Sequence, residues 1–313
     1  MIVSGAFLKA ELEEPYFARP PEGYRTPGKV WQVNKYLYGD KRAPKGWQDY
    51  FAVVLKEYNL ERLVSEPGAF YSKTKKLLLV VHVDDMLVIA HTHVLEEFVQ
   101  FLKTKLKLKR VEHVQLGKPF AFLGDEITIH PNKVTIKAKD EYVDNMLDIM
   151  GMKNCRTVDT PMVHKESPEE GDDIPLTEDE QKKYQVVCGI LMYYKRHRFD
   201  LHYAGKSLAM HASTATQLDM RRLKRVLRYC LKTRDMELVM PVQTRWPSTV
   251  VGWADASWAD DPKTRRSTSG GVLEVAGACV HAWSRTQAIV AQSSAEAELY
   301  AATACAAELL WLR

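Results

Sequence analysis

Apolar residues recur at helical spacing in several stretches of the chain. In residues 47–58 the apolar positions fall at i, i+3, i+4, i+7 and i+8, which predicts a helix. Comparable patterns predict a helix over residues 140–150 and helical structure over most of residues 181–240. A last helix is expected from Ser294 to the end of the chain.

Other stretches have the pattern of strands. Residues 77–90 consist of two short apolar runs around a polar centre, His82-Val83-Asp84-Asp85, and predict two strands. A hairpin that turns at Pro131-Asn132 is expected from the runs on either side of it. Further strands are expected at residues 249–254, 271–276, 279–283 and 288–291.

The distribution of charge suggests how the chain is divided. Eight acids and two prolines fall within residues 166–180, which is typical of a solvated linker. The 313 residues suffice for two or three domains. We therefore expect three parts: residues 1–150, residues 151–245 with the acidic linker, and residues 246–313. The net charge of +4 is too small to indicate a nucleic-acid partner by itself.

Composition excludes several classes of protein. No apolar run approaches the roughly 18–20 residues of a membrane span, and the first residues lack the basic region of a signal peptide. None of the five cysteines lies within four residues of another, so there is no CxxC motif. Their odd number, without a signal peptide, favours a reduced intracellular protein.

Asp84 and Asp85 stand between the two apolar strands. Their simplest interpretation is a hairpin turn, where acidic residues are common. A turn would also let both side chains reach one site, although neighbouring side chains within a strand face opposite sides. Mg²⁺ is commonly held by one or two carboxylates together with substrate phosphates. The pair therefore also suits a polymerase palm, which needs a third carboxylate from another strand.

A second group of acids lies near the end of the chain. Asp255 ends an apolar strand, and Ser293 with Glu296 fits the capping box that begins a helix. A carboxylate at Glu298 would share a helical face with residues that pack on a sheet, where it is costly unless paired. If Glu298 lies instead at the edge of that face, in the first turn of the helix, its carboxylate needs no such partner. Spacing leaves both interpretations open. The residues expected on this face are Ala301, Ala302, Cys305, Leu309 and Leu312.

Arg221, Arg225, Arg228 and Lys232 form a basic stripe along one predicted helix. A solvated helix face is the ordinary interpretation of such a stripe. Because the stripe carries no acid, the alternative is that it follows a phosphate backbone. Residues 103–110 are a second, weaker basic candidate. Four tryptophans are expected in the core: Trp246, Trp253, Trp258 and Trp283.

Together these segments resemble the reverse transcriptase–RNase H region of a copia-type LTR retrotransposon polyprotein. The resemblance extends over essentially all 313 residues, in the family's order. In the first half the matching segments are Ala6-Phe7-Leu8, Tyr36-Leu37-Tyr38-Gly39, His82-Val83-Asp84-Asp85 and Phe122-Leu123-Gly124, the last similar to a primer grip. In the second half they are residues 223–229, Asp255-Ala256-Ser257-Trp258, residues 266–270 and residues 293–298.

The resemblance implies an α/β chain in which an α+β palm precedes an RNase H-like domain, both incomplete. It implies Mg²⁺ at Asp84 and Asp85 for DNA synthesis, and at Asp255 and Glu298 for cutting RNA in an RNA–DNA hybrid. Phe7 would exclude a ribose 2′-hydroxyl, and the basic stripe would grip the template–primer. The implied partners are an RNA template, a DNA primer, their hybrid and deoxynucleoside triphosphates, without a membrane. The implied location is the cytoplasm, in a virus-like particle if the chain is part of a polyprotein, with the nucleus as the alternative.

Several departures from the family pattern lower the expected activity. Ile2 occupies the position of the first palm Asp, His82 replaces the Tyr of the acidic box, and Arg42 stands where the family has Gln. The last RNase H acid would lie beyond Arg313, and both ends of the sequence look cut. We therefore expect a polymerase with RNase H activity by lineage that is weak or inactive in this chain. The alternatives are a nucleic-acid-binding remnant and a non-functional relic.

Overall fold

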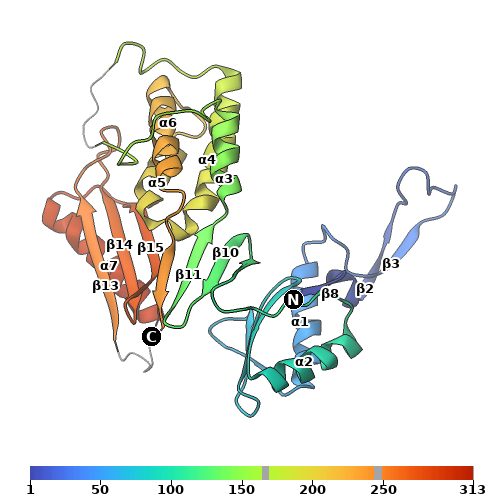
Figure 1. Ribbon diagram of the computed structural model, residues 1–313. Coiled ribbons are helices and arrows are strands. Elements are labelled where there is room, and N and C mark those ends of the chain that lie inside the picture. The colour runs from blue at the N-terminus through green and yellow to red at the C-terminus, as the bar shows by residue number, and fades with distance from the viewer. Residues whose placement is uncertain (164–168, 243–248, 313) are drawn as a thin grey trace. The chain divides into compact units, whose positions relative to one another are not determined.

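The computed structural model describes residues 1–163, 169–242 and 249–312 (Figure 1). The chain divides into two compact units, Met1–Val114 and Gln115–Arg313. Residues 115–150 therefore pack with the second unit, whereas the sequence analysis grouped them with the palm. Helices and several small sheets occur in both units, in agreement with the predicted α/β class.

The first unit is built on a six-stranded antiparallel sheet in the order β4-β5-β6-β7-β1-β8. Helices α1 (Ala43–Lys56) and α2 (Thr92–Lys105) bury their apolar sides in one core with this sheet. Helix α1 was predicted; α2 was not, although its buried residues are spaced by four. The strands are β1 (Ile2–Val3), β4 (Glu61–Arg62), β5 (Ala69–Ser72), β6 (Leu77–His82), β7 (Asp85–Ile89) and β8 (Leu108–Arg110).

A separate two-stranded hairpin belongs to the first unit. It consists of β2 (Glu11–Ala18) and β3 (Trp31–Lys35), which pair antiparallel. A short 3₁₀ helix, η1 (Phe7–Lys9), precedes it and packs near α1. This hairpin was not predicted from the sequence.

The second unit joins a helical layer to two sheets. One apolar core holds α3 (Asp140–Ile149), α4 (Glu178–Tyr194), α5 (His202–Met210) and α6 (Gln217–Lys232). The short 3₁₀ helices η2 (Lys195–His197) and η3 (Phe199–Leu201) link α4 to α5. The four-stranded sheet has the order β12-β11-β10-β9 and includes the predicted hairpin. Its strands are β9 (Pro119–Phe122), β10 (Asp125–Ile129), β11 (Lys133–Ala138) and β12 (Leu238–Pro241).

The three-stranded sheet has the order β13-β14-β15. Helix α7 (Ser294–Leu312) covers β13 and β14, and α5 contacts β15 (Figure 1). Its strands are β13 (Val250–Ser257), β14 (Thr268–Val275) and β15 (Ala278–Thr286).

Residues 288–291 are not the strand that the sequence analysis expected. The carbonyl of Ala291 instead accepts a hydrogen bond from Trp258 Nε1 at 2.9 Å, so a side chain satisfies this backbone group in place of a neighbouring strand. The expectation that Trp253 and Trp258 lie in the core was also wrong, since Trp253 is 60% exposed and Trp258 is 48% exposed. Trp283 is buried as expected. Trp246 lies outside the described residues.

The acidic segment is only partly a linker. Glu178, Asp179 and Glu180 form the first turn of α4, where Thr177 and Glu180 complete a capping box. Asp172 contacts α6, as described below. Residues 166–168 lie outside the described part of the chain. The prediction of a solvated linker over the whole of residues 166–180 was therefore wrong, because these acids serve a helix start and an internal ion pair.

Candidate functional site

Asp84 and Asp85 lie at a tight turn between β6 and β7. His82, the last residue of β6, pairs with Asp85, the first of β7, so Val83 and Asp84 alone form the turn. Val83 has a φ of 55°, a conformation that is uncommon for a β-branched residue and indicates local strain. The turn that the sequence predicted is therefore present, with Asp84 in the turn and Asp85 directly after it.

Two contacts from outside the hairpin hold this turn. Trp47 Nε1 of α1 donates a hydrogen bond to the carbonyl of Val83 at 2.6 Å. The amide of Val3 donates to the carbonyl of Asp84 at 2.9 Å. Trp47 is buried and its ring stacks on that of Phe51, with 5.0 Å between the centroids. Since the indole cannot move freely, it fixes the strained turn. Sequence reasoning placed Trp47 on a helix but gave no signal for this contact.

Ile2 lies directly opposite Asp85. The two residues are paired in the neighbouring antiparallel strands β1 and β7. Side chains of directly opposed residues extend to the same face, with Cβ atoms about 4.5–5.5 Å apart. A carboxylate at position 2 would therefore stand beside that of Asp85. Ile2 supplies an apolar side chain there instead.

The two carboxylates are half-buried. Within the described ranges 1–163, 169–242 and 249–312, neither side chain forms a hydrogen bond or an ion pair with the protein. Two unpaired carboxylates offer the oxygen ligands that Mg²⁺ prefers, with further positions left to water and phosphate. The donor set thus fits a magnesium ion. No group of three His, Cys, Asp or Glu side chains suited to a metal occurs among the described residues.

Phe7 and Arg42 lie in the same unit. Phe7 of η1 is half-buried, and its ring contacts that of Tyr38, with 4.8 Å between centroids. Arg42 precedes α1 and forms an ion pair with Asp40 at 3.3 Å. Hydrogen bonds from the backbone and side chain of Arg42 lower the pKa of Asp40. In this structure Arg42 is thus engaged by a neighbouring carboxylate.

Asp255 and Glu298 lie on neighbouring elements of the second unit. Gly252 of β13 faces α7, because a Cβ at this position would stand 2.7 Å from Cys305 Sγ. Side chains alternate along a strand and the pairing of β13 is regular, so Asp255 points to the other face of the sheet. No hydrogen bond or ion pair joins Asp255 to Glu298 in the described structure. Both side chains are exposed.

The sequence left open whether Glu298 lies on the buried face of its helix or at the edge of that face. The residues of α7 that are buried are Ala297, Ala301 and Cys305, and Ala302 is exposed like Glu298. Glu298 and Cys305 are about 20° apart on an ideal helical wheel, but Glu298 lies about 60° from Ala301 and about 100° from Ala297, at the edge of the buried line. Of the two interpretations left open, the edge of the stripe agrees with the structure.

The start of α7 has half of the expected capping box. Ser293 Oγ accepts a hydrogen bond from the Glu296 amide at 3.2 Å. The Glu296 carboxylate accepts from the amide of Gln292 at 2.7 Å, one residue earlier than a capping box requires. Glu296 therefore serves the helix start, and Glu298 is left without this task.

The turn at Leu123-Gly124 is held by the end of α4. Tyr193 Oη donates a hydrogen bond to the Leu123 carbonyl at 2.8 Å, and Arg196 donates to the same oxygen at 3.2 Å. Arg196 also forms an ion pair with the buried Asp125 at 3.0 Å and stacks on Tyr193. A Cβ on Gly124 would lie 2.7 Å from the Tyr193 hydroxyl. The sequence showed the Phe-Leu-Gly segment but not its partners, which come about 70 residues later.

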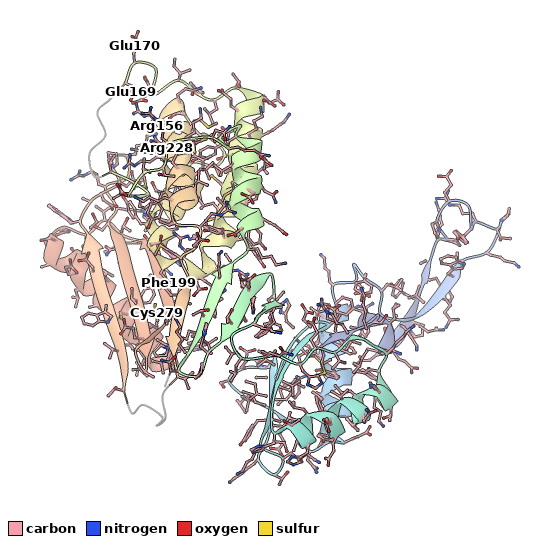
Figure 2. All side chains as sticks on the ribbon, viewed as in Figure 1. Arg156, Glu169, Glu170, Phe199, Arg228 and Cys279 are labelled. Carbon is pink, nitrogen blue, oxygen red and sulfur yellow. The ribbon has the colours of Figure 1, made fainter. Side chains whose placement is uncertain are left out.

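The basic stripe of α6 has partners within the chain. Arg221 forms ion pairs with Asp172 at 2.8 Å and with Glu169, and Lys232 forms one with Asp159. The two side chains between them are also engaged. Arg225 donates to Thr160 Oγ1. Arg228 donates to the backbone carbonyl of Arg156, and Figure 2 labels these two residues. The alternative of a stripe left open for phosphates was therefore wrong, because Asp159, Glu169 and Asp172 supply the acids that the stripe itself lacks.

Comparisons with known proteins agree with these observations. The profile of the reverse transcriptase (RNA-dependent DNA polymerase) family matches residues 1–164. The chain is 28% identical over 325 aligned positions to the retrovirus-related Pol polyprotein from transposon TNT 1-94 of Nicotiana tabacum. It is also 28% identical to the putative transposon Ty5-1 protein of Saccharomyces cerevisiae and 30% identical to an uncharacterized mitochondrial protein of Arabidopsis thaliana.

The extent of these matches differs between relatives. The alignments cover 99% of this chain for the tobacco and Ty5-1 proteins and 75% for the mitochondrial protein. The chain spans 24% of the tobacco polyprotein, 100% of the Ty5-1 protein and 94% of the mitochondrial protein.

No helix in the described ranges is long and apolar enough to cross a membrane. The acidic turn of the first unit and these matches together place the chain in the reverse transcriptase family of copia-type LTR retrotransposons.

Proposed function

We propose that this chain is the catalytic region of an RNA-directed DNA polymerase whose magnesium site uses Asp84 and Asp85. The observation that carries the proposal is the pairing of Ile2 with Asp85 beside the acidic turn. This pairing brings a third strand position to the two acids, as a palm requires. The substrates are deoxynucleoside triphosphates, and the partners are an RNA template and a DNA primer.

Each residue near the turn has a distinct role in this proposal. Asp84 and Asp85 hold Mg²⁺, which supplies charge stabilisation to the phosphoryl group and the attacking primer hydroxyl. Trp47 orients the two acids through the carbonyl of Val83. The ring of Phe7 excludes a ribose 2′-hydroxyl, so that deoxynucleotides are selected. Ile2 contributes no ligand, and the site has two acids in place of three.

The missing ligand lowers the expected activity of the chain. Electrostatic stabilisation is usually the largest catalytic contribution, and single groups are worth about 10²–10³ in rate. We therefore propose that polymerase activity is weak or absent while Ile2 is present. A nucleic-acid-binding remnant is the second candidate. The missing ligand at position 2 would lower catalysis without changing the other residues that contact nucleic acid. A relic with no retained function is the remaining alternative.

A second activity is proposed for the second unit. Asp255 and Glu298 would hold Mg²⁺ for cutting RNA in an RNA–DNA hybrid. Both acids are exposed, but Asp255 points to the face of the sheet away from α7, so this assignment rests on the resemblance to the family.

Primer extension on an RNA template tests the polymerase proposal. The purified chain is compared with Asp84→Asn, Asp85→Asn and Ile2→Asp in the presence of Mg²⁺. We expect weak or undetectable extension by the unsubstituted chain and a measurable increase for Ile2→Asp. Adding Asp85→Asn to Ile2→Asp should abolish the increase. Extension that is equal in all five proteins would contradict the assignment of these acids.

A further inference from the structure

The tip of the β2–β3 hairpin carries two exposed aromatic rings. Of Tyr24, 71% is exposed, and of Trp31, 47%. Their centroids are 6.1 Å apart and the rings meet edge to face. The hairpin extends away from the sheet of the first unit (Figure 1). An edge contact between two rings leaves much of their surface open for another planar group.

The strand pairing assigns Trp31 to one face of the hairpin, and Tyr24 of the loop contacts its ring. Trp31 pairs with Ala18, so both side chains extend to the same face. Phe17 precedes Ala18 and therefore faces the other way. It is 69% exposed, more than Trp31. The hairpin thus provides an aromatic residue of similar exposure as a control on its opposite face.

Basic residues lie close to the two rings in the sequence. Between the strands, residues 19–30 include Arg19, Arg25 and Lys29 against one acid, Glu22. Residues 21–30 are all exposed. Arg25 Nε donates a hydrogen bond to the carbonyl of Pro20 at 3.2 Å, which anchors the stem of this side chain near the tip. The tip therefore combines open aromatic surface with a positive charge.

This combination fits one class of partner. Proteins bind single-stranded nucleic acid by stacking bases on aromatic rings while cations contact the phosphates. A paired duplex offers no free base faces along its length, so it would not use the rings. We propose that Tyr24 and Trp31 stack unpaired bases of a single strand, with Arg25 and Lys29 contacting its phosphates. The inference rests on the proposed function, from which it takes nucleic acid as the partner. It adds the place on the chain where the single-stranded part of that partner is bound.

Binding of labelled nucleic acids by fluorescence anisotropy tests this proposal. The probes are a blunt RNA–DNA hybrid and the same hybrid with a single-stranded oligothymidylate extension. The proteins are the unsubstituted chain, Trp31→Ala, Tyr24→Ala, Trp31→Phe and the control Phe17→Ala. Thermal unfolding of each variant shows whether it is folded. Because these side chains are exposed, we expect the same midpoint for all.

The extension should strengthen binding by the unsubstituted chain. Trp31→Ala should weaken binding of the extended probe about tenfold, which is within the range measured for base stacking on aromatic residues. Trp31→Phe should restore most of it, and Phe17→Ala should change nothing. Affinity for the blunt hybrid should be the same in every protein.

Other outcomes overturn the proposal in distinguishable ways. If Trp31→Ala and Phe17→Ala bind both probes like the unsubstituted chain, the stacking site is wrong and the proposed function stands. If no protein binds either probe, the proposed function fails together with the stacking site. If Trp31→Ala changes only the oligomeric state measured by sedimentation, the rings contact a second copy of the chain and the inference is wrong.

Discussion

Replacing Ile2 by aspartate should create a repulsive pair of carboxylates that Mg²⁺ relieves. Ile2 and Asp85 are directly paired in β1 and β7, so the two side chains would extend to the same face. At a separation of roughly 5 Å and an effective dielectric constant of about 20, two unit charges repel by about 3 kcal/mol. Salt and partial exposure reduce this value, and we expect a loss of about 1–2 kcal/mol in the free energy of unfolding at neutral pH.

The matched control is Ile2→Asn. Asparagine has nearly the same shape as aspartate and removes the same apolar side chain, but it carries no charge. The difference between the two variants therefore isolates the repulsion from the loss of the isoleucine. Both are compared by urea unfolding at low ionic strength, with and without millimolar Mg²⁺.

Metal binding to the native state should reverse the difference. At a free concentration ten times the dissociation constant, a ligand stabilises the native state by about 1.4 kcal/mol. Without metal, Ile2→Asp should be less stable than Ile2→Asn; with Mg²⁺ it should become equally or more stable. If the two variants are equally stable under both conditions, the side chain at position 2 does not face Asp85, and the argument for a third ligand position is refuted.

Three further predictions follow from individual contacts. Trp47→Phe leaves the Val83 carbonyl without its indole donor, and we expect a loss of about 1–3 kcal/mol in urea unfolding; an unchanged midpoint would show that the contact does not hold the turn. Gly271→Ala places a Cβ 2.1 Å from the Trp283 ring and should cost about 1–3 kcal/mol, whereas unchanged stability would mean that the ring moves freely. Burial, and then Lys195, lower the pKa of His202 from 6.5 to about 4. The native state therefore resists a proton that the unfolded chain accepts, and stability should fall as the pH drops from about 6.5 towards 4, by about 1 kcal/mol after allowance for partial exposure. His202→Gln should remove this acid dependence, and an unaltered pH profile would contradict it.

The local elements near the site could be predicted because their signals are short-range. The strand, turn and strand around Asp84 follow from apolar runs interrupted by polar residues. Helix α7 begins close to the serine and glutamate that suggested a cap. Helix α2 was not predicted, although its buried residues Val94, Phe98 and Leu102 recur at helical spacing.

Residues that act through distant partners could not be predicted in this way. The stripe on α6 has the spacing of an open basic face, yet Lys232 is paired with Asp159, which lies 73 positions earlier. Glu298 has the spacing of a buried position, yet it is exposed, because burial depends on where the helix lies over the sheet. The spacing of residues along one helix shows neither which distant residues pair with them nor where the helix lies over a sheet.

The sequence by itself determined the family and the types of most elements, and it predicted the acids of two candidate sites. Such features depend on residue identity and on spacings of a few residues, which motifs and periodicity record. Only the tertiary structure decided that Ile2 stands opposite Asp85 and that Trp47 holds the Val83 turn. It also decided that Asp255 points away from α7. The physical reason is that strand register and the face of a side chain are fixed by pairing between segments far apart in the chain, so that one shift in register would place each acid in a different environment.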